Sequence, residues 1–252
     1  LGIPHCVIFN DLSREAIQIR CKLIKCKILI TSANNDSYIK KINPIKKHLK
    51  IKVLRFANIK SKKLAINFDE FFNKKNTSIN YDYKFFKSNQ TSFILFTSGS
   101  TGEPKGIVHS TGGYLVYSKL TCSKKFNISK KTIILTASDA GWINGHTYAL
   151  YGPLSLCATT IILEKPLSLL DENVLKKILL QMKVNILYLP VTLIRLIKAI
   201  NIKKKIISKY LKLLGSMGEP LSKYVGIWFS KKFSNKQLQI VNTYFQTETG
   251  GI

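Results

Sequence analysis

The fold of this chain is decided by one stretch, FILFTSGSTGEPKG at residues 93–106. An apolar run leads directly into a segment with three glycines, four hydroxyl side chains and one lysine. Glycines let backbone N–H groups approach an anion, hydroxyls add donors, and a lysine adds charge. The stretch therefore predicts a buried strand followed by a phosphate-binding loop. Its spacing differs from the Walker A pattern, which argues against a P-loop NTPase and leaves a plain polar hairpin as the alternative.

Beyond residue 90, β-branched apolar runs alternate with longer amphipathic segments. Such alternation predicts an α/β fold, a layered sheet with helices on its faces, whose sites lie in the loops at strand ends. The expected strands are 92–96, 132–136, 159–163, 185–189, 211–214 and 238–242. The expected helices are 113–120, 171–182, 191–199 and 222–230.

The residues before this region carry a weaker pattern. An apolar run at His5–Phe9, a helical stretch capped by Ser13 and a second apolar run at Lys27–Thr31 predict a β-α-β unit. Residues 57–90 are polar and weakly periodic, which predicts a surface connection with one short helix around Phe68–Phe72.

The charge of the chain suggests a different class of partner. Lysine and arginine number 40 against 13 acidic residues, a net charge of +27, so nucleic acid or an acidic membrane must be considered. The lysines are scattered through nearly every segment, and no RNA-binding motif is present. Abundant Lys, Ile and Asn are typical of an AT-rich genome. We therefore expect small-molecule substrates and no nucleic acid, and the oligomeric state stays open.

The cysteines and the apolar runs bear on the compartment. The five cysteines form no CxxC pair and no metal-ligand pattern, and an odd number of such thiols suits a reducing cytoplasm. No apolar run reaches the length of a membrane span, and no signal-peptide pattern opens the chain. We therefore expect a cytoplasmic protein without membrane attachment.

Four further regions resemble one enzyme family. They are IVHSTGGYL at 107–115, DAGWINGHTY at 139–148 with YGPL at 151–154, LGSMGEP at 214–220 and TYFQTETG at 243–250. Together with residues 97–106 they resemble the acyl-adenylate-forming ligases. Within that superfamily they are most similar to the AMP-forming acetyl-CoA synthetases, and the propionyl-CoA synthetases are a near second in similarity. The resemblance covers nearly the whole chain and is weakest between residues 32 and 90.

The resemblance implies both a fold and an activity. The fold is part of the large N-terminal domain of these ligases, two β-sheet subdomains flanked by helices, with residues 1–252 as a partial AMP-binding domain. The activity is ATP-dependent ligation of acetate to coenzyme A, with ATP, Mg²⁺ and coenzyme A as cofactors and propionate as the alternative acid. Family members continue into a small swinging domain that carries the catalytic lysine. Because the chain starts without Met and stops after the last motif, we expect an internal piece, inactive or nearly so alone. A remnant that at most binds ATP is the other alternative.

The resemblance also assigns the nucleotide site, but no catalytic residue within the chain. Glu248 is expected to hold Mg²⁺, and Thr247 is expected to contact the α-phosphate. The residues expected to bind ATP are Thr97, Ser98, Gly99, Ser100, Thr101, Gly102, Lys105, Gly218, Glu219, Pro220, Asn242, Thr243, Tyr244, Phe245, Gln246 and Thr247. Asn242 stands where the family has an Asp, so it keeps an acceptor for the adenine amino group but loses the charge.

The acyl pocket shows the clearest departures from the family. The expected lining is Trp142, Ile143, Asn144, Met217 and Phe245, with His146 as scaffold. The acetate enzymes typically carry Val, Thr, Val and Trp at the positions of Ile143, Asn144, Met217 and Phe245. Phe245 should make the pocket roomier, whereas Ile143 and Met217 take space back, so acetate and propionate both remain open. For coenzyme A, Lys41 keeps a positive charge where the family has an arginine.

Overall fold

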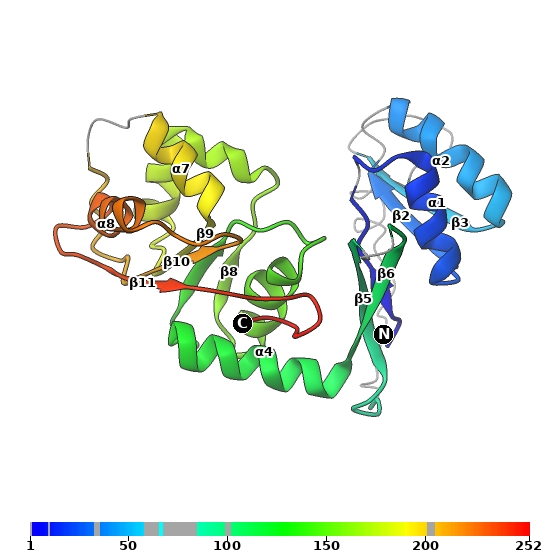
Figure 1. The fold of residues 1–252 in the computed structure, drawn as a ribbon, viewed down its shortest axis with the longest axis horizontal. Helices are drawn as coiled ribbons and strands as arrows, with labels where there is room; N and C mark the ends of the chain where they lie inside the picture. The colour runs from blue at the N-terminus through cyan, green and yellow to red at the C-terminus, as the bar shows by residue number, and fades with distance from the viewer. Residues whose placement is uncertain are drawn as a thin grey trace. The chain divides into compact units, whose positions relative to one another are not determined.

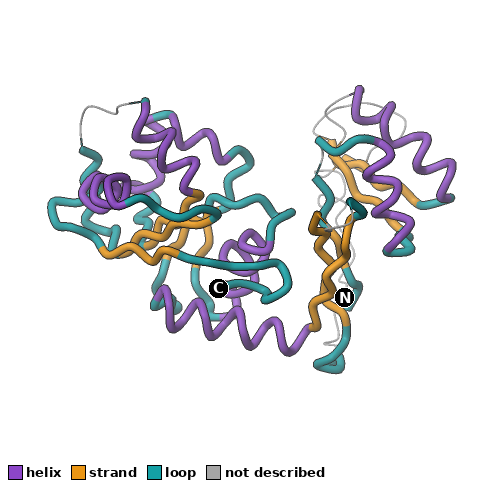
Figure 2. The backbone as a smooth tube through the Cα atoms, in the orientation of Figure 1, coloured by secondary structure: helices purple, strands orange, loops and turns teal. Residues whose placement is uncertain are grey.

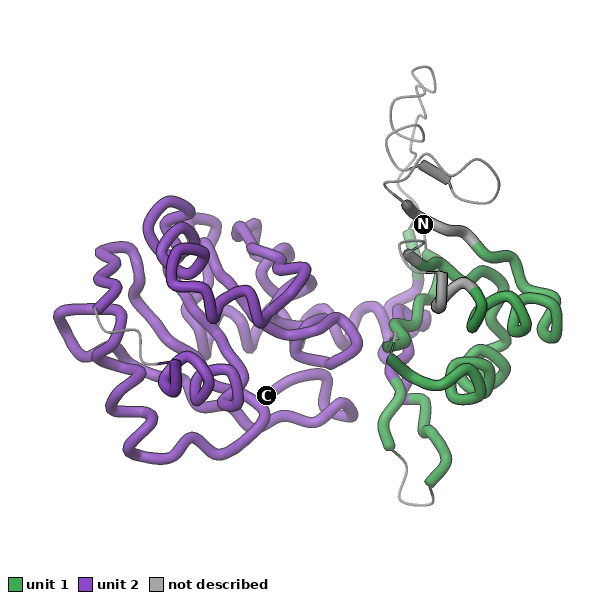
Figure 3. The backbone as a smooth tube through the Cα atoms, turned by 90° about the horizontal axis from the view of Figure 1, so that it is seen from above, with its two compact units in different colours: residues 1–86, 96–106 green, residues 87–95, 107–252 purple. Residues whose placement is uncertain are grey.

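The computed structural model describes residues 2–9, 11–32, 36–57, 66–67, 85–98, 102–200 and 205–252. The chain divides into two compact units, each treated by itself below. The first unit consists of Leu1–Phe86 with Phe96–Gly106, and the second of Lys87–Leu95 with Ile107–Ile252 (Figure 3). The chain therefore passes between the units three times, within strands at two of these crossings.

The second unit is built on a five-stranded sheet whose strand order is β11-β10-β9-β7-β8. All neighbouring strands are parallel. The strands are β7 (Ile133–Thr136), β8 (Thr159–Ile161), β9 (Ile186–Pro190), β10 (Leu213–Met217) and β11 (Gln239–Asn242). From β7 the chain adds β8 on one side, and then adds β9, β10 and β11 on the other. Ligands of open parallel sheets bind beside such a reversal, at the carboxyl ends of the strands.

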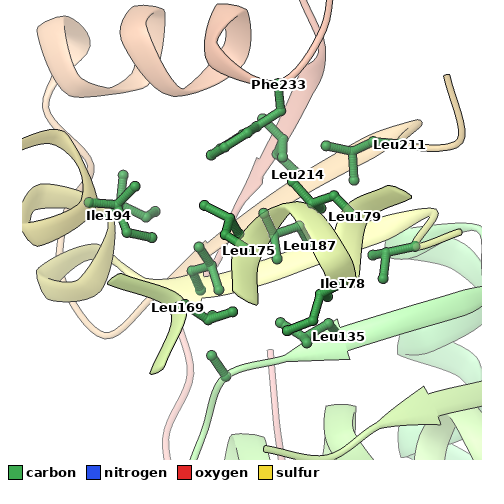
Figure 4. Packing of buried hydrophobic residues seen from close by; sticks show 14 of the residues in the cluster. Leu135, Leu169, Leu175, Ile178, Leu179, Leu187, Ile194, Leu211, Leu214 and Phe233 are labelled. Carbon is green, nitrogen blue, oxygen red and sulfur yellow. The ribbon is translucent and has the colours of Figure 1, made fainter. Parts of the chain in front are cut away.

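Helices cover both faces of this sheet (Figures 1 and 2). Alternate strand residues point to opposite faces, so Leu135 and Leu187 join one core cluster while Ile134 and Ile186 join the other. The first cluster packs beneath α6, η3, α7 and α8 (Figure 4), and the second packs against α4 and η1. The helices are α4 (Thr111–Phe126), η1 (Gly145–Tyr151, a π-helix), α5 (Gly152–Ser155), η2 (Pro166–Leu170, a 3₁₀-helix), α6 (Glu172–Lys176), η3 (Lys177–Gln181, a π-helix), α7 (Val191–Ala199) and α8 (Lys223–Lys232).

The first unit contains a small parallel sheet of order β2-β3-β4. Its elements are α1 (Arg14–Leu23), β2 (Ile28–Ser32), α2 (Asp36–Leu49), β3 (Lys52–Ala57) and β4 (Ile66–Asn67). The cap of α1 confirms the prediction for Ser13, whose Oγ accepts a hydrogen bond from Ala16 N at 3.1 Å. A further sheet has the order β1-β5-β6, with β1 (His5–Cys6), β5 (Thr91–Ser98) and β6 (Pro104–Ser110). None of the described helices has the length and apolar composition needed to cross a membrane.

Most of the predicted elements are confirmed, and the α/β class with them. The six strands expected beyond residue 90 all occur, helix 191–199 has the predicted bounds, and helix 113–120 is longer than predicted. The β-α-β unit predicted from His5 to Thr31 is wrong, because β1 and β2 belong to different sheets. The parallel β-α-β unit of this region is instead β2-α2-β3. The polar connection at 57–90 includes β4, and Phe68–Phe72 lies outside the described residues.

Candidate functional site

The glycine-rich stretch connects β5 and β6, which are neighbours in their sheet. Thr97 and Ser98 end β5, and Lys105 lies in β6 with an exposed side chain. Gly102 has φ +83°, a left-handed conformation that favours glycine. The predicted loop is too long, because residues 104–106 belong to a strand that begins at a proline. The predicted phosphate ligands Gly99, Ser100 and Thr101 lie outside the described residues.

A pocket of about 400 Å³ lies in the second unit where β10 and β11 end. Because the two strands are parallel neighbours, the segments that follow them leave the same edge of the sheet. The pocket is lined by Gly218, Glu219, Pro220, Asn242, Thr243, Tyr244 and Phe245. All seven are among the residues predicted to bind ATP. Two sequence motifs that are distant in the chain thus form one concave surface.

The side chains of this pocket offer polar groups and an open aromatic face. Glu219 Oε2 accepts a hydrogen bond from Arg195 Nη1 at 2.8 Å, an ion pair exposed to solvent. Asn242 Oδ1 accepts from Ser216 Oγ at 2.9 Å, and an amide oxygen has a second lone pair for another donor. Tyr244 is 79% exposed, which leaves its ring available to stack on a base.

Behind the pocket, a row of hydrogen bonds runs into the sheet. Thr243 Oγ1 lies 2.9 Å from Ser216 O and 2.7 Å from the hydroxyl of Tyr188. The Tyr188 hydroxyl lies 3.2 Å from Asn144 Nδ2, which also lies 3.3 Å from Met217 Sδ. Burial raises the pKa of Tyr188 well above its ordinary value, so its hydroxyl keeps its proton at neutral pH. The row joins a pocket-lining residue to two residues of the predicted acyl pocket.

The residues predicted to line the acyl pocket differ in exposure. Ile143, Asn144 and Met217 are buried, whereas Trp142 is 56% exposed. Phe245 is half-buried and packs against two core clusters, one that contains Met217 and another that contains Ile143. Phe245 is thus linked to Ile143 and Met217 through these clusters, and Asn144 is linked to Met217 by the contact of its Nδ2 with the sulfur.

The turn that carries Glu248 is held by the helix η1 and by His109. Thr147 Oγ1 donates to Gly250 O at 2.6 Å, and His109 Nε2 lies 2.8 Å from Thr247 O. His109 stacks on Phe93, with ring centroids 4.8 Å apart. Burial lowers the pKa of His109, although its bond to the Thr247 carbonyl and the nearby Glu248 carboxylate oppose this. A neutral His109 donates from Nε2 to the carbonyl and fixes the turn.

The donor set at this turn fits Mg²⁺ only together with a bound phosphate. Glu248 is exposed, and the described residues contain no group of three His, Cys, Asp or Glu side chains able to hold a metal. Mg²⁺ commonly binds through one or two carboxylates plus substrate phosphate oxygens and water. One exposed carboxylate, three residues after Phe245 of the pocket, is consistent with that mode.

Lys41, the predicted coenzyme A contact, lies in the first unit. Its Nζ donates to Leu12 O at 2.7 Å, which anchors α2 to the segment before α1. An ammonium group has three donors, so this bond leaves it able to donate elsewhere as well.

Comparison with known proteins places the chain in a family. The sequence model of the family described as AMP-binding enzyme matches residues 1–252. The chain belongs to the AMP-binding enzyme family. The resemblance to acyl-adenylate-forming ligases is thereby confirmed.

Members of the family with curated names are similar over the whole chain. Acetyl-coenzyme A synthetase 2 of Debaryomyces hansenii is 37% identical over 99% of this chain and 39% of its own length. Acetyl-coenzyme A synthetase of Yersinia pestis is 35% identical over 100% of this chain and 41% of its own length. The chain therefore spans about two fifths of the length of these relatives. A crystal structure of a Brucella canis acyl-CoA synthetase aligns with a TM-score of 0.80 at 23% identity, covering 98% of this chain and 43% of that one. This alignment confirms the fold.

The sequence did not reveal Tyr188, which connects Thr243 to Asn144. Tyr188 stands in the otherwise aliphatic run ILYL of β9, and a single polar tip in a buried strand was the available signal. Likewise, Thr147 and Tyr148 belong to a motif associated with the acyl pocket, yet their hydroxyls bond to Gly250 O and Ile252 N.

Proposed function

We propose that this chain provides the nucleotide and acid sites of an ATP-dependent acetate–CoA ligase. The whole enzyme converts acetate and ATP to acetyl-AMP and pyrophosphate, and then transfers the acetyl group to coenzyme A. The observation that carries the proposal is the pocket in which the 218–220 and 242–245 segments meet. The names of the relatives at 35–37% identity over the chain support the substrate.

The chain's residues act by binding and orienting two anions. In the first half-reaction a carboxylate oxygen attacks the α-phosphorus. The bond from that phosphorus to pyrophosphate breaks, and its electron pair leaves with the pyrophosphate. Tyr244 and the Gly218–Pro220 turn hold the base, and Thr247 holds the α-phosphate. Since no protein nucleophile is needed, positioning and electrostatics supply the rate enhancement. Mg²⁺ held at Glu248 would reduce the charge repulsion between the reactants.

Propionate is the second candidate acid. Phe245 stands where the acetate enzymes typically have the larger tryptophan, and we propose that the acid site accepts one more carbon for this reason. Lys41 is proposed to contact a coenzyme A phosphate. The proposed compartment is the cytoplasm, which the five free cysteines support.

Calorimetric titration with ATP and Mg²⁺ tests this proposal. Tyr244→Ala should weaken ATP affinity by about 5- to 150-fold, because stacking a base on an aromatic ring contributes about 1–3 kcal/mol. Tyr224→Ala is the matched control, since this tyrosine of α8 is 72% exposed but does not line the pocket. Absence of ATP binding by a folded chain, or equal weakening by both substitutions, would contradict the proposed function.

A further inference from the structure

The side-chain amide of Asn242 lies at the pocket in which the base of the nucleotide is proposed to bind. Asn242 ends β11, is exposed and lines this pocket. It is the cross-strand partner of Ser216 in β10, so the two side chains lie on the same face of the sheet. Ser216 Oγ donates to Asn242 Oδ1 at 2.9 Å. One end of the amide is therefore anchored to the sheet.

The orientation of this amide follows from the burial of Ser216. The Ser216 side chain is fully buried, and its hydroxyl proton goes to no other acceptor within the described part of the chain. In a rotated amide, Nδ2 would donate to Ser216 Oγ and leave the buried hydroxyl proton unpaired, which costs free energy. Oδ1 therefore faces Ser216 and keeps one lone pair. The Nδ2 group keeps both protons, since it has no hydrogen-bond partner among the described residues.

The backbone beside this amide is also held in place. Thr243 N and Thr243 Oγ1 both donate to Ser216 O, at 3.0 and 2.9 Å. The amide of Asn242 thus offers a ligand an acceptor and a donor group from a fixed position.

These two groups match both classes of purine. The 6-position of a purine carries either an amino group, which donates a hydrogen bond, or an oxo group, which accepts one. Oδ1 can accept from the amino group of adenine, and Nδ2 can donate to the oxo group of hypoxanthine or guanine. A carboxylate in the same place would only accept, and it would repel the oxo group.

The other side chains of the pocket select little between the two classes. Tyr244 offers an exposed ring, and stacking on it is tolerant because every base has a π-face. Glu219 carries the one carboxylate among the described residues that line the pocket, and it is paired with Arg195 at 2.8 Å. No unpaired carboxylate of these lining residues is therefore present to exclude an oxo group.

From this arrangement we infer that the pocket binds 6-oxopurine nucleoside triphosphates as well as ATP, and that Asn242 sets this tolerance. The inference rests on the proposed function and widens the range of nucleotides that can serve it, with acetate still the acid. With either base the amide makes a neutral hydrogen bond at the 6-position, and the exchange of one such bond for another changes affinity little.

Calorimetric titration of the full chain with ATP and with inosine triphosphate, each with Mg²⁺, tests the inference. Inosine triphosphate has the 6-oxo group without the 2-amino group of guanine, so it differs from ATP only at the 6-position and the adjacent N1 proton. It should bind within about fivefold of ATP. A larger preference for ATP would overturn the inference and leave the proposed function standing. A folded chain that binds neither nucleotide would contradict both.

Two substitutions of asparagine by aspartate separate recognition of the base from a general effect of charge. Asn242→Asp keeps an acceptor for Ser216 but removes the donor, so the preference for ATP over inosine triphosphate should rise by about 5- to 150-fold. Asn173→Asp adds the same charge at an exposed position of α6 that does not line the pocket, and it should leave the ratio of the two affinities unchanged.

The ratio of the two affinities is the deciding quantity, because a partial loss of folding weakens both nucleotides by the same factor. An unchanged ratio in Asn242→Asp, or an equal rise in both variants, would show that Asn242 does not read the 6-position and would overturn the inference.

Discussion

At the scale of single residues, Gly215 is required because of its neighbour and not because of its backbone conformation. Gly215 and Tyr188 are paired across β10 and β9. A Cβ on Gly215 would lie 2.4 Å from Tyr188 Cδ2 and 3.2 Å from Phe126 Cε1. The absent side chain is therefore what admits the Tyr188 ring and the hydrogen bonds it makes.

Gly215→Ala should lower the free energy of unfolding by about 1–3 kcal/mol, the usual cost of overpacking a core. It should also weaken ATP binding, because Thr243 loses its support. Urea unfolding and calorimetry measure the two effects. Gly226→Ala is the matched control. Gly226 lies inside α8, its Cβ would lie 3.4 Å from the Leu221 side chain, and alanine is the better helix former. Similar destabilisation by both substitutions would contradict the explanation.

The cysteines give a second prediction at this scale. Burial raises the pKa of Cys21 and of Cys122 to about 12 and that of Cys6 to about 11, and it also raises the pKa of Cys26. Their reactive thiolate fractions at pH 8 are therefore small. Cys157 is exposed, so iodoacetamide should modify one cysteine rapidly, and Cys157→Ser should remove this fast phase. Rapid modification of several cysteines in the folded chain would refute the prediction.

At the scale of elements, the π-helix η1 anchors the segment that carries Glu248. Thr147 Oγ1 donates to Gly250 O at 2.6 Å and accepts from the Tyr114 hydroxyl at 2.8 Å. Tyr148 accepts from Ile252 N at 3.0 Å. Gly145 opens the helix, and a Cβ there would lie 2.2 Å from Asp139 O, so the preceding loop can close tightly onto η1.

Thr147→Val should remove both hydrogen bonds, destabilise the chain by about 1–3 kcal/mol and reduce Mg²⁺-dependent ATP affinity, because the turn around Glu248 loosens. Thr160→Val is a matched comparison. Thr160 donates to Ala149 O of the same helix at 2.7 Å, on a strand distant from the turn in sequence. That substitution should reduce stability alone. Unchanged ATP affinity in Thr147→Val would show that η1 does not support the nucleotide site.

At the scale of the whole molecule, the second unit depends on residues 87–95, which precede residues 96–106 of the first unit in the sequence. Phe93 is fully buried and stacks on His146 with ring centroids 4.5 Å apart. Leu95 joins the same core cluster. Removal of two such side chains costs about 2–5 kcal/mol each, against a typical total stability of about 5–15 kcal/mol.

A polypeptide of residues 107–252 should therefore unfold without a cooperative transition, whereas residues 87–252 should melt cooperatively. Thermal melting followed by circular dichroism compares them directly. Equal melting temperatures for the two polypeptides would mean that Phe93 and Leu95 do not contribute to the core of this unit.

The sequence predicts what is local and misses what depends on pairing. Strands beyond residue 90 are recognisable because β-branched runs alternate with amphipathic segments. Six of the seven pocket-lining residues stand in the motifs at 214–220 and 243–250, and Asn242 immediately precedes the second motif. Helix α2 was not predicted, because Pro44 in its interior normally signals a helix break. The partners of β1 and the position of Tyr188 beside Thr243 depend on strand order and register, which no local pattern specifies.

The hydrogen bonds from Asn144 through Tyr188 and Thr243 to Ser216 O all run in one direction. Their bond dipoles add head to tail, and each bond polarises the next. The side chains of this row consequently have fixed orientations before any ligand arrives. A ligand in the pocket therefore meets a lining residue, Thr243, whose hydroxyl is already held in place, and such preorganisation favours affinity.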